Sequence, residues 1–371
     1  MTDRSLRLVL VSTPIGWVGS GAGGGVELTL SSLVQGLAQQ GHQLTLIAPR
    51  GSSLPKGCST LSIKLVEVAG ADQPSWQHAD EDAPVLIPPM GVLPAMLEEA
   101  LRLSAEADAV LNFGYDWLPM WITPWVPAPM FHLISMGAVS MVMKRAIESV
   151  SRWNQGRLAF HTLRQASDFD LLQPARVVGN GFDLSQYIFR EESGGPLGWA
   201  GRIAPEKGLE DAAAAAAALG DRLLVWGLRE DDAYANAVEA AVPAGTIEWR
   251  GFLSTSDLQK ELGDCRALLN TPKWNEAYGN VVVEAMACGV PVIAYDRGGP
   301  GELVRSGENG LLVSPDDVSE LTAAVSRCET IQRRACRDWV ERHASCAVFS
   351  QRVETWIREG LAADGNITAM H

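Results

Sequence analysis

The chain has 371 residues, of which 47% are hydrophobic and 20% charged, and its net charge at pH 7 is −14. A chain of this length favours two domains, and the acidic balance argues against a surface that binds nucleic acid or an anionic membrane. No run of eighteen or more apolar residues occurs, so we expect no transmembrane helix. The apolar stretch near the N-terminus is too short for a signal peptide and indicates a first strand.

The first half of the chain opens with a strand, a helix and a second strand, predicted over residues 6–12, 26–39 and 44–48. This succession predicts a parallel sheet, because a crossover helix joins parallel strands. Later strands are predicted at residues 109–112 and 130–134.

A glycine-rich loop, residues 20–25, follows the first strand and opens the first helix. Gly24 and Gly25 would let the backbone approach a donor phosphate or an acceptor at the helix mouth. The loop is not a clean GxGxxG motif and no acid ends the second strand, so no dinucleotide cofactor is predicted. Trp17 and Glu27, on either side of the loop, are candidate acceptor contacts, with capping of the helix as the alternative for Glu27.

Tryptophan and proline dominate the stretch WLPMWITPWVPAPM, residues 117–130. We predict a loop that either packs on the core or offers an aromatic platform for an acceptor, because aromatic rings stack on flat ligands. Asp116, directly before it, either orients an acceptor hydroxyl or caps the following turn. The helix around Lys144 and Arg152 has few cations and includes Glu148, so we interpret it as a soluble helix rather than a membrane-binding one.

The second half repeats the alternation, with strands predicted at residues 197–200, 222–226, 247–250, 267–270 and 292–295. Two such cycles predict an α/β protein with two Rossmann-like domains, whose intervening cleft is the default ligand site. We expect an N-terminal domain over residues 1–188, a C-terminal domain over 189–347 and a final helical segment over 348–371.

The segment GRIAPEKG joins a predicted strand to a predicted helix and contains Gly201, Arg202 and Lys207. We expect the two cations to converge on one anion, because fixed positive charges can neutralise a leaving diphosphate without a metal. A lone arginine or lysine is more often a surface charge.

Two carboxylates, Glu276 and Glu284, stand eight positions apart on either side of the turn Ala277-Tyr278-Gly279-Asn280, which opens an apolar helix. The N-terminal end of a helix suits a phosphate. A diphosphate held there would have one acid for the sugar hydroxyls and one for the ribose hydroxyls. Solvated glutamates are the alternative, but it does not explain why Glu284 stands within VVVEAMA.

The Glu276–Glu284 spacing, followed by AMACGVPVIA and a glycine pair, resembles the donor-site signature of the retaining glycosyltransferases of family four, which have the GT-B fold. The order of GRIAPEKG before this segment matches the same family. The resemblance implies two Rossmann-like domains facing across a cleft, with the last helix returning to the first domain. It also implies that Gly251 and Phe252 hold the nucleotide base, most often uracil, and that His132, at a predicted strand end, faces the transferred sugar. A structural role is the alternative for His132.

The opening VSTPIGWVGSGAGGGVELTL resembles cyanobacterial pteridine glucosyltransferases, which move glucose from UDP-glucose to a reduced biopterin. Together, the resemblances predict a UDP-sugar donor as co-substrate, a small-molecule acceptor and no cofactor. The alternatives are a transferase of cell-envelope polysaccharide or glycolipid synthesis and a non-catalytic protein that binds a nucleotide-sugar. The sequence makes no prediction about the oligomeric state.

Metal-binding motifs are missing from the sequence, which has no HExxH, no strand-flanked DxD and no Cys/His cluster at ligand spacing. We therefore expect catalysis without a metal. No protein nucleophile is assigned, as the resemblance to retaining transferases implies. The six cysteines show no CxxC pairing, which indicates reduced core thiols and a cytoplasmic protein.

Overall fold

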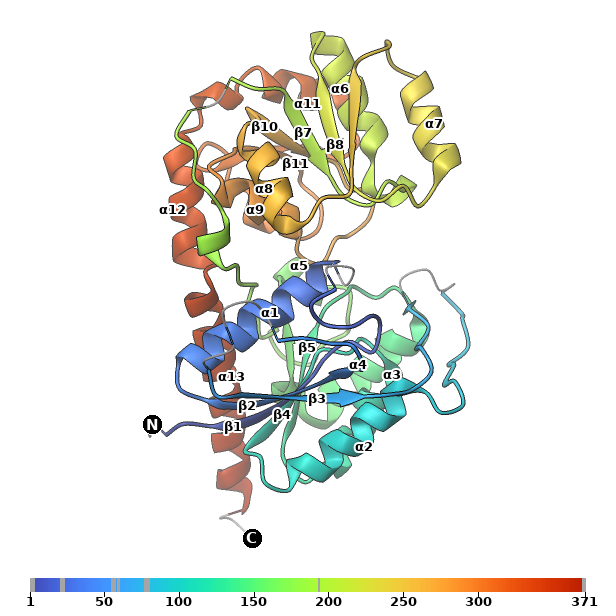
Figure 1. Ribbon diagram of the computed structural model, residues 1–371, viewed down its shortest axis with the longest axis vertical. Coiled ribbons are helices and arrows are strands. Elements are labelled where there is room, and N and C mark those ends of the chain that lie inside the picture. The colour runs from blue at the N-terminus through green and yellow to red at the C-terminus, as the bar shows by residue number, and fades with distance from the viewer. Residues whose placement is uncertain are drawn as a thin grey trace. The chain divides into compact units, whose positions relative to one another are not determined.

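The computed structural model describes residues 4–20, 24–54, 58, 61–76, 81–192 and 194–368 (Figure 1). Its contacts divide the chain into two units. Unit 1 comprises Met1–Phe182 and Cys346–His371, and unit 2 comprises Asp183–Ser345. The sequence analysis set the domain limits after residues 188 and 347, whereas these units divide after Phe182 and Ser345.

Unit 1 is built on a six-stranded parallel sheet. Its strands are β1 (Arg7–Val11), β2 (Gln43–Pro49), β3 (Ile63–Val68), β4 (Ala109–Asn112), β5 (Met130–Ile134) and β6 (Leu158–Phe160). They lie in the order β3-β2-β1-β4-β5-β6. The register pairs Arg7 of β1 with Gln43 of β2, and Leu8 of β1 with Ala109 of β4. The strand order reverses between β1 and β4, and ligands of α/β proteins bind at the carboxyl ends of strands at such a point.

Helices cover both faces of this sheet. They are α1 (Gly24–Gln39), α2 (Val92–Ser104), α3 (Trp117–Ile122), α4 (Met141–Asn154), α5 (Leu163–Ala166) and α13 (Cys346–Thr368), with short 3-10 turns at Thr123–Trp125 and Gln155–Arg157. On one face Leu33 of α1 shares a core cluster with Trp356 of α13, and on the other Met96 of α2 packs with Val110.

The helix α13 follows unit 2 in sequence but packs on unit 1, against α1. Gly36 permits the close approach of the two helices, because a Cβ at this position would stand 2.5 Å from Ser350 Oγ. Gln40 Nε2 donates to the same Ser350 oxygen at 3.0 Å. Trp356 is buried and donates from Nε1 to the Gly156 carbonyl at 2.7 Å. The core of unit 1 therefore includes side chains from both ends of the sequence.

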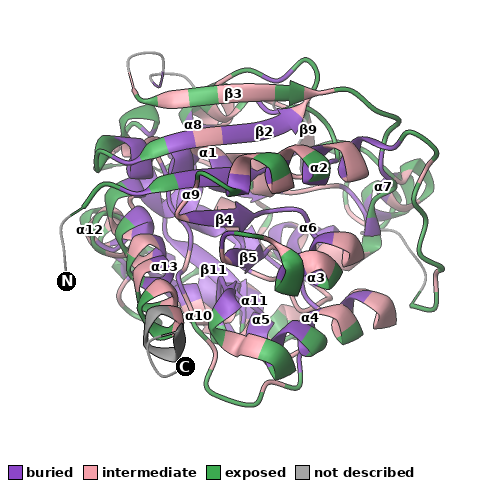
Figure 2. Cartoon of the chain, turned by 90° about the horizontal axis from the view of Figure 1, so that it is seen from below, coloured by how far each residue is buried: buried purple, intermediate pink, exposed green. Residues whose placement is uncertain are grey.

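Unit 2 contains a second six-stranded parallel sheet. Its strands are β7 (Leu197–Ala200), β8 (Leu223–Trp226), β9 (Ile247–Gly251), β10 (Ala267–Asn270), β11 (Val292–Tyr295) and β12 (Gly310–Val313). They lie in the order β12-β11-β10-β7-β8-β9, so β7 and β10 are neighbours although long segments separate them in sequence. Figure 2 shows β4, β5 and β11 buried along their length, whereas the edge strand β3 has intermediate and exposed residues.

The helices of unit 2 are α6 (Leu209–Leu219), α7 (Asp232–Ala240), α8 (Thr255–Gly263), α9 (Asn280–Ala287), α10 (Pro300–Leu303), α11 (Val318–Val325) and α12 (Arg333–His343). Short 3-10 turns lie at Leu184–Gln186, Pro205–Lys207 and Cys328–Thr330. The alanine run of α6 packs in the core beneath β7 and β8, where Ala212 and Ala216 are fully buried. Alanine favours the helix and allows it to approach the sheet closely.

The predicted α/β architecture with two parallel sheets is confirmed. The prediction of a loop was wrong for residues 117–125, which form α3 and a 3-10 turn, whereas residues 126–129 form a loop that leads into β5. Pro119 is compatible with α3, since it lies in the first turn, where backbone N–H groups have no intrahelical acceptor. Among the residues that the structure describes, no helix is both long and apolar enough to span a membrane.

Candidate active site

The centre of the candidate site is an ion pair in unit 2 between Lys207 and Glu276. Lys207 ends the 3-10 turn that follows β7, and Glu276 lies in the loop between β10 and α9. Lys207 Nζ is 2.9 Å from Glu276 Oε1 and 5.0 Å from the centroid of the Trp274 ring. The two side chains are 16% and 18% exposed, so a ligand can reach the pair, while partial burial strengthens its charge interactions.

Backbone contacts fix the loop of Lys207 against the loop of Glu276. Gly208 adopts φ +67°, and a Cβ there would collide with the Thr271 carbonyl oxygen. Thr271 Oγ1 donates to the Gly208 carbonyl at 2.7 Å, and the Lys273 N–H donates to the Glu206 carbonyl at 2.9 Å. The ion pair is therefore held by the two loops as well as by the side chains.

A glycine pair supports the other side of the Glu276 loop. Gly298 adopts φ +58°, and a Cβ there would stand 2.5 Å from the Glu276 nitrogen. The Gly299 N–H donates to the Glu276 carbonyl at 2.7 Å. Tyr278 is buried, and Gly279, with φ +95°, is the N-cap of α9. The positive end of the helix dipole therefore lies within a few residues of Glu276.

Ala277 and Asn280 complete the turn that leads into α9, and both are partly exposed. Lys273, at the start of this loop, pairs with Asp211 and lies 3.0 Å from Asp316. Arg297 also contacts Asp316, at 2.6 Å, and the two cations hold the pKa of Asp316 at about 2, with the Arg297 hydrogen bond as the main cause. The loop of Glu276 is thus anchored by charges at its start and by glycine contacts at its end.

Arg202 has acidic partners of its own. Its Nη1 lies 2.6 Å from Glu230 Oε2 and its Nη2 lies 2.7 Å from Glu206 Oε1, and the side chain is 21% exposed. The structure thus joins Lys207 to Glu276 and Arg202 to two other carboxylates. The expected convergence of both cations on one anion would require both to exchange their partners.

Glu284 lies one turn into α9, where it is buried in an apolar helix. The Tyr187 hydroxyl donates to its Oε1 at 3.1 Å. Burial raises the Glu284 pKa to about 7, and the Tyr187 hydrogen bond opposes this rise. The predicted position of Glu284 in the helix is correct, but the group that it contacts here is a tyrosine hydroxyl from the segment before β7.

Glycines line the carboxyl ends of β7, β8 and β9. The Gly201 N–H donates to the Trp226 carbonyl at 3.0 Å, and Gly227 N–H donates to the Gly251 carbonyl at 2.9 Å. A Cβ at Gly227 would collide with the Gly201 carbonyl oxygen. Phe252, directly after Gly251, is 56% exposed, so its ring is available to a ligand such as a nucleotide base.

In unit 1, the described part of the glycine-rich loop is held by Glu27. Its Oε1 accepts from the Gly19 N–H at 2.7 Å, and its Oε2 accepts from the Ser20 hydroxyl at 3.2 Å. Gly24 and Gly25 form the start of α1, whereas residues 21–23 lie outside the described residues. Trp17 is 53% exposed. Glu27 thus holds Gly19 and Ser20 of the loop, a contact different from the two roles considered in the sequence analysis, which were an acceptor contact and a helix cap.

Asp116 caps α3 and is buried. Its Oδ1 accepts from the Leu118 N–H at 3.4 Å, and its Oδ2 accepts from Gln73 Nε2 at 3.0 Å and Trp76 Nε1 at 3.1 Å. Burial raises its pKa. Of the two roles considered for Asp116, the structure shows the capping role.

His132 does not lie at a strand end, as expected from the sequence, but in the middle of β5. It is completely buried. Its Nδ1 is 3.1 Å from Asn112 Nδ2 and its Nε2 is 2.7 Å from Thr123 Oγ1, and burial lowers its pKa to about 3. The expectation of a strand-end histidine is therefore corrected: in this structure His132 is a neutral core residue with a partner at each ring nitrogen.

Within the described ranges, no three His, Cys, Asp or Glu side chains are arranged to hold a metal ion. All six cysteines are buried thiols without a disulfide. The contacts also identify site residues that the sequence analysis missed, namely Glu206, Glu230, Trp274 and Tyr187. Trp274 stands two positions before Glu276, which was its only local signal. Tyr187 and Glu230 lie too far away in sequence from their partners for any local pattern to reveal them.

Comparison with known proteins places these features in a family context. A family model described as "Glycosyl transferases group 1" matches residues 195–330. A glycogen synthase of Mycobacterium tuberculosis is 27% identical over 343 residues, which covers 81% of this chain and 81% of the synthase. A 2-deoxystreptamine glucosyltransferase of Streptomyces kanamyceticus is 34% identical, covering 40% of this chain and 42% of the transferase. An exopolysaccharide phosphotransferase of Streptomyces coelicolor is 55% identical over 53 residues, so the chain spans only 6% of that relative.

Solved structures share the fold over nearly the whole length of the chain. Sucrose-phosphate synthase from Thermosynechococcus elongatus aligns with a TM-score of 0.75 at 18% identity, covering 97% of this chain and 100% of the synthase. Anabaena HepE in complex with UDP and glucose aligns with a TM-score of 0.71 at 16% identity, covering 94% of this chain and 98% of HepE. At such identities the likeness establishes the fold alone, which is that of the GT-B glycosyltransferases.

Proposed function

Starting from a GT-B fold and a second unit that matches the group 1 glycosyltransferases, we propose that this protein is a retaining glycosyltransferase of family four. It moves a sugar, in the simplest case glucose, from a UDP-sugar to a small cytoplasmic acceptor such as a pteridine, without a metal. UDP-glucose is the donor best supported by the structural neighbours, because HepE was solved with UDP and glucose.

The observation that carries this proposal is the partly exposed Lys207–Glu276 ion pair. A nucleotide-sugar offers an anionic diphosphate and neutral hydroxyl groups in one molecule. On binding, Lys207 would exchange the Glu276 carboxylate for a phosphate, and Glu276 would exchange the ammonium group for sugar hydroxyls. Neither charge would then be left unpaired, so the exchange avoids the cost of an uncompensated charge in a partly buried site.

Arg202 can take part in the same way. Its two carboxylate partners and its own side chain are partly exposed, so a diphosphate can replace them. As the bond between the anomeric carbon and the diphosphate oxygen breaks, negative charge grows on the leaving group. Fixed cations at that position stabilise the transition state more than the bound donor, which is what accelerates the reaction.

The proposed reaction retains the configuration of the sugar. The acceptor hydroxyl oxygen forms a bond to the anomeric carbon on the face from which the diphosphate departs, and its proton passes to the leaving phosphate oxygen. No protein nucleophile is required. Glu276 orients the sugar by accepting hydrogen bonds from its hydroxyls, and Glu284 accepts from the ribose once its contact with Tyr187 is exchanged.

The names of the similar proteins support two kinds of acceptor. A small metabolite is favoured by the 2-deoxystreptamine glucosyltransferase, whose name denotes a small acceptor. The exopolysaccharide phosphotransferase and a lipopolysaccharide galactosyltransferase of the same fold favour the alternative of cell-envelope synthesis. The pteridine itself is supported by the opening sequence of the chain.

The proposal is tested by incubating the protein with UDP-glucose and a panel of pteridine, aminocyclitol and sugar acceptors. We expect release of UDP and a product heavier by one hexose in mass spectrometry, and loss of both in Lys207→Ala. Lys260→Ala, on the exposed face of α8, is the matched control. UDP binding without transfer or donor hydrolysis would show a non-catalytic binding protein instead.

The same assay tests the need for a metal. Turnover in an excess of EDTA should stay within about twofold of the untreated value, because Arg202 and Lys207 supply the positive charge that a metal would otherwise provide. Loss of turnover that magnesium or manganese restores would contradict this expectation.

A further inference from the structure

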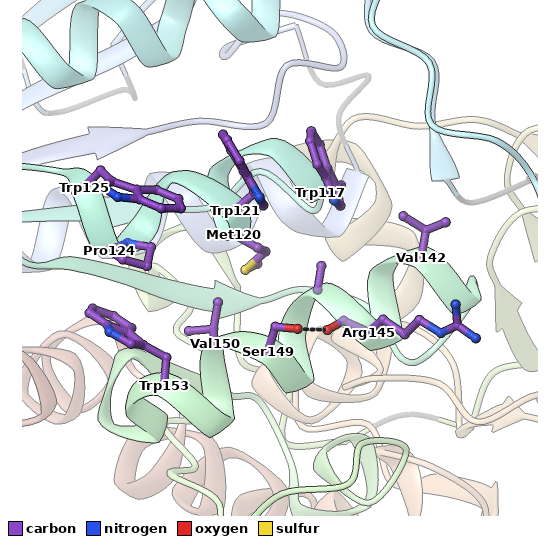
Figure 3. Close-up of a pocket in the computed structure, with 11 residues that line it drawn as sticks. Trp117, Met120, Trp121, Pro124, Trp125, Val142, Arg145, Ser149, Val150 and Trp153 are labelled. Atoms are coloured by element: carbon purple, nitrogen blue, oxygen red, sulfur yellow. Dashed lines mark hydrogen bonds between the residues drawn. The ribbon is translucent and has the colours of Figure 1, made fainter.

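A groove of about 390 Å³ lies between α3 and α4 of unit 1 (Figure 3). Four tryptophans line it, namely Trp117, Trp121, Trp125 and Trp153. In Figure 3 the first three stand along the α3 side and Trp153 faces Trp125 from α4. The groove is lined by residues of unit 1, whereas the Lys207–Glu276 ion pair belongs to unit 2.

The tryptophan row follows from helical spacing. Trp117, Trp121 and Trp125 are four positions apart, so they share one face of α3 and of the 3-10 turn that continues it. Trp117 and Trp121 are stacked, with ring centroids 5.8 Å apart and planes inclined by 17°. Trp121 and Trp125 are 5.0 Å apart. The mutual stacking keeps the rings ordered, and an ordered aromatic surface binds a ligand at a lower entropy cost.

These rings are not buried by the rest of unit 1. Trp121, Trp125 and Trp153 are 56%, 65% and 51% exposed. A single exposed apolar residue needs no explanation, but a cluster of large aromatic residues around one hollow marks an interaction site. Its volume falls within the roughly 300–1,000 Å³ of small-molecule sites.

The charge of the residues that line the groove indicates which class of ligand it favours. Arg145 is the only charged residue among those that line it. Within the described part of the chain no carboxylate forms a salt bridge with Arg145, whereas Lys144, its neighbour, pairs with Glu148 and Asp170. In a protein of net charge −14, a hollow with one cation and no carboxylate in its lining favours an anion.

We propose that the groove between α3 and α4 binds a flat, largely aromatic small molecule that carries one anionic group. The rings of the ligand pack against the tryptophan row, and the anionic group pairs with the Arg145 guanidinium. The inference goes beyond the proposed function, since it requires neither the donor nor sugar transfer. A neutral aromatic molecule would use the tryptophans alone and bind more weakly.

Two fluorescent probes with the same ring system test the proposal on the full-length protein. 8-Anilinonaphthalene-1-sulfonate (ANS) carries an anionic sulfonate, and N-phenyl-1-naphthylamine lacks it. Fluorescence titration of the folded protein should show saturable binding of ANS at one site, tighter than that of the neutral probe. Tryptophan fluorescence should be quenched at the same probe concentration.

Substitutions separate the stacking from the charge. Trp121→Ala should weaken both probes by about fivefold or more, because it removes the middle ring of the row. Arg145→Gln should weaken ANS by about threefold, as expected for a partly exposed ion pair, and leave the neutral probe unchanged. Arg152→Gln on the same helix and Leu172→Ala, an exposed apolar residue, are the matched controls and should change neither titration.

Circular dichroism and the thermal midpoint should confirm that each variant is folded, because ANS also binds partly unfolded chains. The proposal is overturned if ANS does not saturate, if Arg145→Gln behaves like Arg152→Gln, or if Trp121→Ala binds both probes normally. A flotation assay with phosphatidylglycerol vesicles tests whether the groove binds a membrane surface instead of a small molecule. Binding to vesicles that Trp121→Ala abolishes, without any saturable ANS site, would assign the groove to a membrane surface instead.

Discussion

The polar candidate residues of the two units differ in exposure and in the kind of contact that holds them. In unit 2, Lys207, Glu276 and Arg202 are ion-paired but partly exposed, so their partners can be exchanged for a ligand. In unit 1, His132 and Asp116 are buried and bonded to fixed neighbours. The compared residues therefore differ in what they can do: Lys207, Glu276 and Arg202 can exchange their partners for a ligand, whereas His132 and Asp116 have fixed contacts within unit 1.

The largest effect should come from the cations of unit 2. Arg202→Ala and Lys207→Ala should each lower turnover about a hundredfold, because each removes a charge that stabilises the leaving diphosphate. Initial rates of UDP release at saturating donor measure the loss, and Arg222→Ala, an exposed arginine, serves as the control for Arg202. Near-normal turnover of both variants would contradict the proposed catalytic role of these cations, and with it the main difference between the candidate residues of the two units.

The buried histidine of unit 1 should affect stability instead of turnover. His132→Phe leaves polar groups of Asn112 and Thr123 without this partner, so the free energy of unfolding should fall by about 2 kcal/mol. Urea unfolding measures this loss. At urea concentrations well below the unfolding midpoint, the kcat of the variant should stay within about threefold of the wild-type value. A stable His132→Phe protein with a hundredfold lower kcat would show that the histidine is catalytic.

Glu284 gives the protein a pH-dependent stability. Its pKa is about 7 in the folded chain and near 4.5 when unperturbed, so between these values the folded state holds a proton that the unfolded state has released. Its contribution is therefore most favourable below pH 4.5 and falls as the pH rises towards 7 and above. Glu284→Gln should remove this slope, worth roughly 2–3 kcal/mol, in urea unfolding from pH 5 to 8. Glu239→Gln, an exposed glutamate on α7, should keep it.

Substitutions of Glu276 and Glu284 should also have different effects on ligand binding, and these effects should be smaller. In calorimetry at pH 8, above the Glu284 pKa of about 7, Glu284→Gln should weaken UDP binding about tenfold, because a ribose hydroxyl loses its charged acceptor. Glu276→Gln should change UDP affinity little but lose most of the discrimination against donors deoxygenated at C3 or C4. Tyr187→Phe should tighten UDP binding, since no hydroxyl then competes with the ribose. The reverse result, with UDP weakened only by Glu276→Gln, would exchange the two roles.

Strand and helix periodicity predicted most of the fold, because buried parallel strands are short apolar runs between helices. The strands missed were β3, β6 and β12. In β3, Lys64 and Glu67 interrupt the apolar pattern, as is common in an edge strand. The strand β6 has only three residues, and β12 is an edge strand whose middle residues are only partly buried. Residues 117–125 were predicted as a loop because the stretch is rich in proline, but Pro119 and Pro124 occupy the first turns of α3 and of the 3-10 turn.

The site was predictable only where its residues are close in sequence. Local motifs gave Arg202, Lys207, Glu276 and Glu284, whose proposed roles still await the experiments above. Partners such as Glu230 and Tyr187 come together only through the packing of β7, β8 and α9. The burial of His132 was equally hidden, because it depends on Thr123, which lies in a turn that had been read as a loop.

The position of α13 has a consequence for synthesis on the ribosome. Phe349 and Trp356 belong to the core of unit 1, yet they are translated after every residue of unit 2. Unit 1 therefore cannot complete its folding before unit 2 has been translated, although it contains the N-terminus of the chain. Unit 2 is translated second but is the first unit to have its full sequence. Until α13 is translated, α1 covers only part of the apolar face that the two helices share. Until α13 leaves the ribosome, the apolar surface that it covers can cause aggregation of the nascent chain. A chaperone would protect the chain in this interval.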